Sequence, residues 1–180
     1  RVVTASGATR STPAGLNART LPLRAAPTAR TPGAVAGGLG RAEGLDESYL
    51  DQVARLLDAL GIEVYTEHLS FTRGRERELG QFAPLPFTER WAELVAGNIA
   101  HVQERLGRRI AVENISYLLG HSTLELTESG FISEVVEQAD CGILLDVTNV
   151  LVNASNHQYD PEEFLADLPD ERVVTGHIAG

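Results

Sequence analysis

Apolar residues recur at helical spacing in several stretches of the chain, and a residue that favours the start of a helix precedes most of them. Between Asp46 and Gly61, valine and leucine recur every three or four positions. Asp46 is a favourable N-cap, and Gly61 stands where helices commonly end. The same pattern, with Thr88 before it and Gly107 after it, predicts the next helix. The helices predicted in this way span residues 46–60, 88–106, about 129–139 and 161–168.

Short runs of apolar and β-branched residues separate these helices. The run 142–145 is continuously apolar, as expected for a parallel strand that is buried on both faces. The long stretch after residue 68 contains Pro84 and Pro86 and predicts a loop, because proline interrupts helices. The predicted strands span residues 62–65, 109–112, 142–145 and 173–176. Strands that alternate with helices predict an α/β fold, either a TIM-type barrel or a doubly wound sheet.

A polar side chain follows each predicted strand. These residues are His68, Glu113, Asp146 and His177. The carboxyl ends of parallel strands meet at one edge of a sheet, so we expect the four side chains to converge there. No strand is followed by the G-x-G-x-x-G pattern of dinucleotide-binding sheets. The sequence therefore favours a partial TIM-type (β/α) barrel, with about four to five of the eight strand–helix units of a complete barrel.

The four strand-end residues are a ligand set typical of non-heme iron, manganese or zinc, since they offer two imidazoles and two carboxylates but no thiolate. Asn114 and Asn149 are predicted to hold these ligands in place or to bind substrate. His157, in a predicted loop near the turn 146–149, is expected to line the pocket. The alternative for any single histidine is a hydrogen-bonded structural role, whereas burial of an unpaired carboxylate would cost several kcal/mol.

Composition narrows the possible functions. The chain has 180 residues, 43% of them hydrophobic, which is enough for the core of one domain. Its 25 acidic residues outnumber the 15 basic ones, all arginine, and this excess argues against a nucleic-acid partner. The single cysteine, Cys141, is expected to be a small buried hydrophobe. No apolar run reaches the roughly 18 residues of a membrane span, so we expect no membrane partner and a cytoplasmic location.

Residues 1–42 differ from the rest of the chain. They contain six arginines, four prolines and no acidic residue, and their apolar positions follow no regular period. We interpret the segment as disordered or non-native. Three explanations stay open: a transit peptide, a basic arm that binds an acidic partner, or a stretch produced by a misassigned start or a shifted reading frame. Residues 43–180 are then predicted to form the metal-binding barrel domain.

Several short motifs occur in the order found in one enzyme family. They are Thr66-Glu67-His68-Leu69-Ser70-Phe71, Leu85-Pro86-Phe87-Thr88, Val112-Glu113-Asn114-Ile115-Ser116, Leu144-Leu145-Asp146-Val147-Thr148-Asn149, the loop Asn153 to Asp160, and His177-Ile178-Ala179-Gly180. On these motifs the chain resembles the multinuclear non-heme iron-dependent oxidative enzymes (MNIO), TIM barrels long catalogued as a domain of unknown function (DUF692). The resemblance extends from about residue 38 to residue 180.

The resemblance implies an iron enzyme that uses dioxygen to modify a ribosomally made precursor peptide, typically at cysteine. It also implies two or three iron ions in the complete barrel, with Glu113 able to bridge two of them and with the ligands His68, Glu113, Asp146 and His177. Asn114 and Asn149 match family positions near the cluster. Such enzymes commonly act with a second protein that presents the precursor peptide, and the resemblance implies such a partner here.

The chain departs from the family pattern at both ends. Family members begin with two further strands, the second ending in an iron-binding histidine, and they continue past the position of Gly180 with further ligands. We therefore expect a central fragment of a barrel, which binds fewer ions and exposes strand edges. Two other interpretations stay open. One is a different metal-dependent barrel, such as a sugar isomerase or a phosphodiesterase, and the other is a fragment without catalytic activity.

Overall fold

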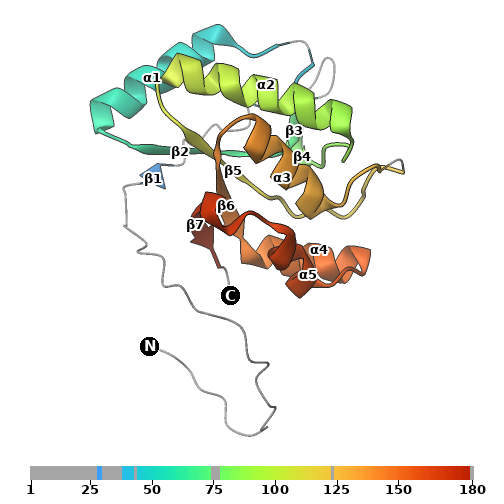
Figure 1. Ribbon diagram of the computed structural model, residues 1–180. Coiled ribbons are helices and arrows are strands. Elements are labelled where there is room, and N and C mark those ends of the chain that lie inside the picture. The colour runs from blue at the N-terminus through green and yellow to red at the C-terminus, as the bar shows by residue number, and fades with distance from the viewer. Residues whose placement is uncertain (1–27, 30–37, 43, 74–77, 123, 179–180) are drawn as a thin grey trace, which may run out of the picture.

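Five parallel strands form the central sheet of the computed structural model, which describes residues 28–29, 38–42, 44–73, 78–122 and 124–178 (Figure 1). The strands lie in the order β1-β2-β5-β6-β7. Among them the order in space follows the order along the chain without reversal, as in a segment of a TIM barrel and unlike a doubly wound sheet. The α/β prediction is therefore confirmed. The bounds are Thr28–Ala29 for β1, Val64–His68 for β2, Ile110–Glu113 for β5, Gly142–Asp146 for β6 and Val173–His177 for β7.

The predicted helices are all present. α1 (Glu47–Leu60) and α2 (Glu89–Leu106) begin after the predicted caps, because the side chains of Asp46 and Thr88 accept hydrogen bonds from backbone N–H groups of the first turns. α3 spans Glu128–Gln138, α5 spans Pro161–Asp167, and a 3₁₀ turn follows at Asp170–Arg172. Among the described residues, no helix has the length and apolar character needed to cross a membrane.

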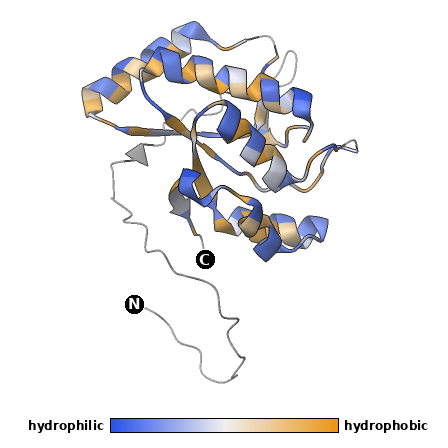
Figure 2. Ribbon diagram, viewed as in Figure 1, coloured by the Kyte–Doolittle hydropathy of each residue, from blue (hydrophilic) through white to orange (hydrophobic). Residues whose placement is uncertain are grey.

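The hydrophobic core lies between the sheet and helices α1, α2 and α3. Val95 and Ile99 of α2 and Phe131 and Val135 of α3 are fully buried. Figure 2 shows apolar residues concentrated along the strands and on one side of the helices. All four residues of β5 are buried, so this strand is covered on both faces. The middle of the sheet is therefore stabilised by packing, and the predicted site residues lie at the carboxyl ends of its strands.

The register of the sheet aligns the carboxyl ends of its strands. His68 of β2 lies beside Glu113 of β5, and Asp146 of β6 lies beside His177 of β7. Leu144 of β6 is the register partner of Glu113. The four predicted site residues are therefore the last residues of four neighbouring strands, as the sequence predicted.

The stretch after β2 is not the loop that its prolines predicted. It forms an antiparallel hairpin of β3 (Phe71–Arg73) and β4 (Glu78–Ala83). Pro84 directly follows β4, so it ends the hairpin without interrupting it. The prolines correctly excluded a helix, but they did not exclude two short strands.

A fifth helix, α4, occupies Val147–His157, where the sequence predicted a turn and a loop. Its sequence is rich in valine, asparagine and threonine, which are weak helix formers, so local propensity gave little signal. The helix forms because the Asp146 side chain caps its first turn and because Val150, Asn153 and Ala154 are buried along one face. His157 is therefore the last residue of a helix rather than a loop residue.

Part of the segment 1–42 belongs to the folded domain. Thr28 and Ala29 of β1 pair with β2 in parallel. Leu39 is 1% exposed and packs in the core, and its carbonyl and that of Arg41 accept hydrogen bonds from the side-chain amide of Asn98. The domain boundary predicted at residue 42 therefore moves toward the N-terminus. Residues 1–27 and 30–37, where the prediction of disorder also falls, lie outside the described residues.

Candidate metal centre

Glu113 forms the centre of the cluster at the carboxyl edge of the sheet. Its side chain is 2% exposed, and its two oxygens face different imidazoles. Oε2 lies 3.4 Å from Nε2 of His68, and Oε1 lies 3.1 Å from Nδ1 of His177. A buried carboxylate requires compensating partners, and two histidines supply them: His68 from the adjacent strand β2 and His177 from β7, one strand beyond β6.

Asp146 completes a group of three potential ligands with Glu113 and His177. One ligand atom from each residue lies within 4.8 Å of the other two. Atoms bound to a single ion through bonds of about 2.1 Å lie within about 4.2 Å of each other, so small side-chain rotations are sufficient to close this group on an ion. Oxygen and imidazole donors suit iron, manganese and zinc. The residues present therefore fit a divalent metal ion.

Two asparagines hold the ligand-bearing segments together. The side chain of Asn114 accepts a hydrogen bond from the backbone N–H of Asp146 at 2.8 Å and donates one to the Asp146 carbonyl at 3.0 Å. Asn149 donates its side-chain amide to the Asn114 carbonyl at 2.9 Å, and its backbone N–H donates to Oδ1 of Asp146 at 2.9 Å. Both predicted asparagines therefore lie at the site, and their contacts position Asp146.

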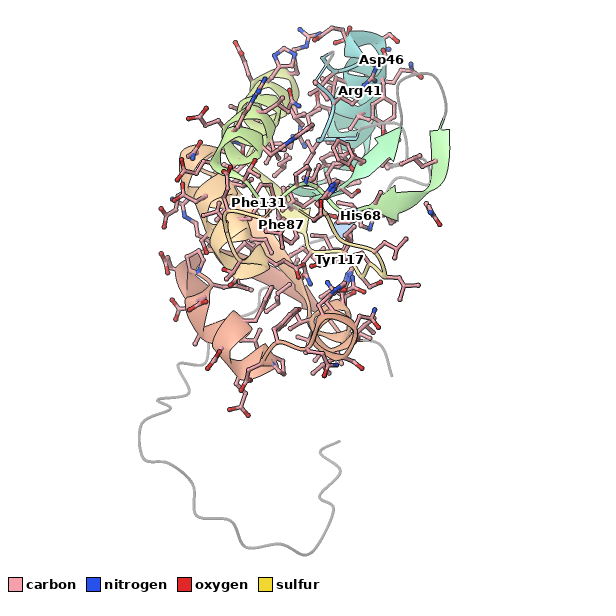
Figure 3. The ribbon with its side chains drawn as sticks, turned by 90° about the vertical axis from the view of Figure 1, so that its right-hand side faces the viewer. Arg41, Asp46, His68, Phe87, Tyr117 and Phe131 are labelled. Carbon is pink, nitrogen blue, oxygen red and sulfur yellow. The ribbon has the colours of Figure 1, made fainter. Side chains whose placement is uncertain are left out.

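The imidazole of His68 is oriented by a residue that the sequence analysis did not identify. Phe82 of β4 stacks on this ring, with 3.9 Å between the ring centroids and 25° between the planes. Figure 3 shows His68 beside the β3–β4 hairpin, which covers this side of the site. The stacked ring turns Nε2 toward Glu113. Phe82 was missed because its stretch was interpreted as a loop.

His157 lies away from the four strand-end residues. Its ring stacks on Tyr117, with 4.5 Å between centroids, and its Nε2 lies 3.1 Å from the Tyr117 carbonyl oxygen. The eleven residues of α4 separate it from Asp146. The structure therefore does not bring His157 to the metal centre, and it places this residue in the wall of a different cavity. The sequence prediction treated α4 as a short turn and loop, which would have kept His157 close.

Cys141 has the role expected from the sequence. Its side chain is fully buried at the start of β6. Burial raises the pKa of the thiol to about 11, so at neutral pH it is protonated and is not a thiolate ligand. The donors at the candidate metal centre are therefore nitrogen and oxygen atoms.

A parallel sheet in which four successive strands, β2, β5, β6 and β7, each deliver one potential metal ligand to the carboxyl edge defines the class: an α/β protein of the TIM-barrel type with a candidate metal centre. Within that class, the chain belongs to the family described as "RiPP precursor modification enzyme MbnB/TglH/ChrH", whose model matches residues 23–180. The resemblance to the MNIO family is thereby confirmed.

Curated relatives agree with this assignment. A UPF0276 protein of Shewanella loihica is 43% identical over 142 residues, which cover 79% of this chain and 50% of the relative. A UPF0276 protein of Neisseria meningitidis is 42% identical over 143 residues, covering 79% of this chain and 51% of the relative. The chain thus spans about half the length of the curated relatives that it matches.

A solved structure supports the fold. The apo form of 3-keto-D-glucoside 4-epimerase from E. coli superposes with a TM-score of 0.52 and 14% sequence identity, covering 81% of this chain and 56% of that chain. At this identity the likeness concerns the fold alone.

Proposed function

We propose that this chain is part of an iron-dependent oxidative enzyme that uses dioxygen to modify a ribosomally made precursor peptide at cysteine. The observation that carries the proposal is the group of Glu113, Asp146 and His177, whose ligand atoms lie within 4.8 Å of one another in a chain of a peptide-modifying family. Because the chain spans half of its relatives, the activity is proposed for the whole protein.

The proposed ligands have distinct positions around the site. His68 of β2 and His177 of β7 both contact the Glu113 carboxylate, and each faces a different one of its two oxygens. As the resemblance implies, Glu113 would be able to bridge two ions, and the complete barrel would hold two or three. When bound, iron would supply the redox chemistry toward dioxygen. Fewer ions are expected in the present chain, because ligands that the resemblance places in other strands are not among its residues.

The other site residues position or shield the proposed ligands before a metal ion binds. Asn114 and Asn149 fix Asp146, so its carboxylate need not be ordered when an ion binds. Phe82 shields one face of His68 from water. We include in the proposal a second protein that presents the precursor peptide, as the resemblance implies.

Metal analysis of an isosteric variant tests the proposal. We expect protein purified without oxygen to contain iron by plasma mass spectrometry, and Glu113→Gln to lose most of it while retaining its helical circular dichroism. Glu137→Gln, on the exposed side of α3, is the matched control and should retain iron. Iron retained by Glu113→Gln, or zinc or manganese in place of iron, would contradict the proposal.

A further inference from the structure

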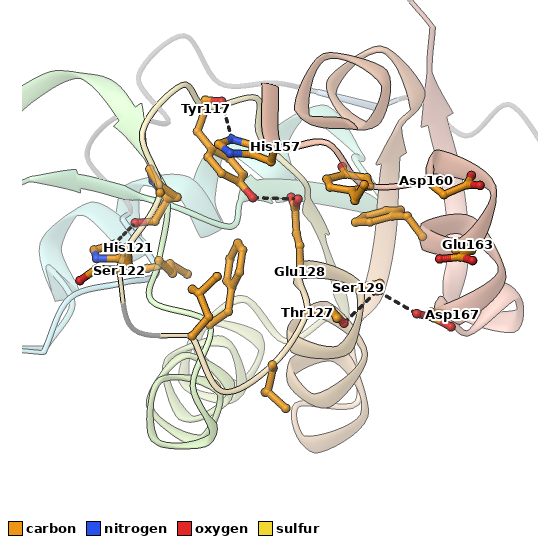
Figure 4. Close-up of a pocket in the computed structure, with 18 residues that line it drawn as sticks. Tyr117, His121, Ser122, Thr127, Glu128, Ser129, His157, Asp160, Glu163 and Asp167 are labelled. Atoms are coloured by element: carbon orange, nitrogen blue, oxygen red, sulfur yellow. Dashed lines mark hydrogen bonds between the residues drawn. The ribbon is translucent and has the colours of Figure 1, made fainter. Parts of the chain in front are cut away.

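A second cavity lies outside the metal centre, between the segment that follows β5, the start of α3, and α5 (Figure 4). We call it the Glu128 cavity, and its walls include Phe87, Tyr117, Glu128, Tyr159, Glu163 and Phe164. Its volume is about 530 Å³, within the range of about 300–1,000 Å³ that is typical of ligand sites. None of the four proposed metal ligands is among its lining residues.

Aromatic rings form much of the wall. Tyr159 and Phe164 stack on each other, with 5.6 Å between their centroids, and Phe87 meets Tyr117 edge to face at 6.1 Å. All four rings line the cavity. The faces of such rings attract cations, and their apolar surface suits the alkyl part of a long side chain.

Glu128 extends into the middle of the cavity, where it meets Tyr117 (Figure 4). The Tyr117 hydroxyl donates a hydrogen bond to Oε2 of Glu128 at 3.0 Å, and the side-chain amide of Asn153 donates to Oε1 at 3.3 Å. These donors fix the direction of the carboxylate. Burial raises the pKa of Glu128 to about 7 although these donors favour the charged form, and a cation beside the carboxylate would stabilise that form further.

The remaining charge of the lining has one sign. Asp160, Glu163 and Asp167 of α5 and its cap add three carboxylates to that of Glu128, and the lining residues include no arginine. Asp160 and Asp167 already accept hydrogen bonds, from the backbone N–H of Glu162 and the hydroxyl of Ser129 respectively. Glu128 extends into the middle of the cavity and Glu163 also lines it, so we take these two acids as the partners of a positively charged group.

Helix α4 sets the distance between the two sites. Its N-cap is the proposed ligand Asp146, and its last residue, His157, lines the Glu128 cavity. Glu128 contacts this helix at Asn153, its seventh residue, and seven helical residues span about 10 Å at a rise of about 1.5 Å each. An extended peptide advances about 3.3 Å per residue, so about three residues cover the same distance.

From these observations we propose that the Glu128 cavity binds the cationic side chain of an arginine or lysine in the peptide substrate, about three residues from the residue that reaches the metal centre. This inference rests on the proposed function in one respect, that the substrate is a peptide. Aromatic walls hold the alkyl stem, and Glu128 and Glu163 pair with the charged end. The cavity would then determine which precursor position is presented to the metal.

Binding of synthetic peptides to the metal-free protein tests the inference. The probes are a labelled decapeptide with arginine three residues before a cysteine, and the same decapeptide with citrulline, which keeps the shape of arginine but not its charge. We expect fluorescence anisotropy to show the arginine peptide binding on the order of tenfold tighter. Equal binding of the two peptides, or equally tight binding of N-acetylarginine amide alone, would overturn the inference.

Matched variants localise the effect. Glu163→Gln and Glu128→Gln should each reduce the preference for arginine over citrulline severalfold. Glu162→Gln changes the residue next to Glu163, does not line the cavity, and should leave the preference unchanged. An unchanged preference in Glu163→Gln would contradict the inference even if Glu128→Gln fails to fold. Because no metal or oxygen is present, this experiment is independent of the iron analysis. The inference about the cavity can therefore be wrong while the proposed iron chemistry is right, and the reverse.

Discussion

Adjacent residues at the end of β5 have different tasks at the candidate metal centre. Glu113 directs its carboxylate oxygens toward two histidines, whereas Asn114, which is 4% exposed, directs both ends of its amide toward the backbone of Asp146. Successive residues of a strand point to opposite sides, and this alternation separates the two tasks. Glu113 is therefore the proposed ligand, and Asn114 is a positioning residue.

Replacement of Asn114 should affect both folding and metal binding. Asn114→Ala leaves a half-buried N–H and a half-buried carbonyl of Asp146 without the Asn114 side chain as partner, so we expect the free energy of unfolding to fall by about 1–3 kcal/mol. Loss of the support for Asp146 should weaken iron affinity by about 10–100-fold. Urea denaturation and competition with a chelator measure the two effects. Asn156→Ala, exposed near the end of α4, should retain iron affinity. Iron affinity unchanged in Asn114→Ala would show that Asn114 does not position the ligand.

Glu128 should make the stability of the metal-free protein depend on pH. Burial raises its pKa from 4.5 in the unfolded chain to about 7 in the folded one, while Tyr117 and Tyr159, which face it, have pKa values raised by burial and stay neutral. The folded state binds the proton more tightly, so this stability is full below pH 4.5 and is lost as pH rises through about 7. The loss amounts to at most about 3 kcal/mol.

Urea denaturation of the wild type and Glu128→Gln at pH 5 and pH 8 measures this contribution. The wild type should lose more stability than the variant between the two values, since glutamine does not titrate. Glu67, whose pKa burial also raises to about 7, leaves the variant with a residual dependence of the same sign. Glu137→Gln should behave as the wild type does. The same loss in Glu128→Gln as in the wild type would assign the dependence to other groups.

At the scale of secondary structure, the helices differ in how strongly their sequences specify them. α1 and α2 have regular apolar faces, polar N-caps and terminal glycines. α4 has the cap but a sequence of weak helix formers, and its burial against the fold stabilises it. α4 also carries a proposed metal ligand at its start and a cavity residue at its end. Its position therefore relates the two sites.

Two glycines of α2 should respond in opposite ways to the same substitution. Gly107 ends the helix at φ 64°, so Gly107→Ala should lower the free energy of unfolding by about 1 kcal/mol. Gly97 lies in an exposed part of the helix, and an added Cβ would meet no atom within 4 Å. Gly97→Ala should therefore raise stability by about 0.5–1 kcal/mol. Thermal and urea unfolding of both variants measure the changes, and destabilisation by both would contradict this account.

At the scale of the whole molecule, the parallel sheet determines where the site forms. Its register makes His68 and Glu113 neighbours and does the same for Asp146 and His177. Residues far apart in the chain therefore meet at one edge, and no local interaction is needed to bring them there. The β3–β4 hairpin and α4 surround this edge.

The sequence by itself determined the α/β class, four helices, three of them with their N-caps, and the four strand-end residues. Each of these depends on local features, such as apolar period, capping residues, and a polar residue directly after an apolar run. The family motifs around His68, Glu113 and Asp146 added the chemistry. The strand-end residues are found where the sequence predicted them because each lies at a fixed position relative to the strand that precedes it.

Only the tertiary structure decided the rest. It formed α4 and the hairpin from sequences with weak propensity, because burial supplies the stability that local preferences lack. Leu39 lies in the core, although the composition of its segment had suggested disorder. His157 lines the Glu128 cavity, whereas the sequence had suggested a position near the metal centre. Glu128 resembled an ordinary acid in the first turn of a helix. Its role depends on the rings and carboxylates that distant segments bring around it, and no local pattern records those contacts.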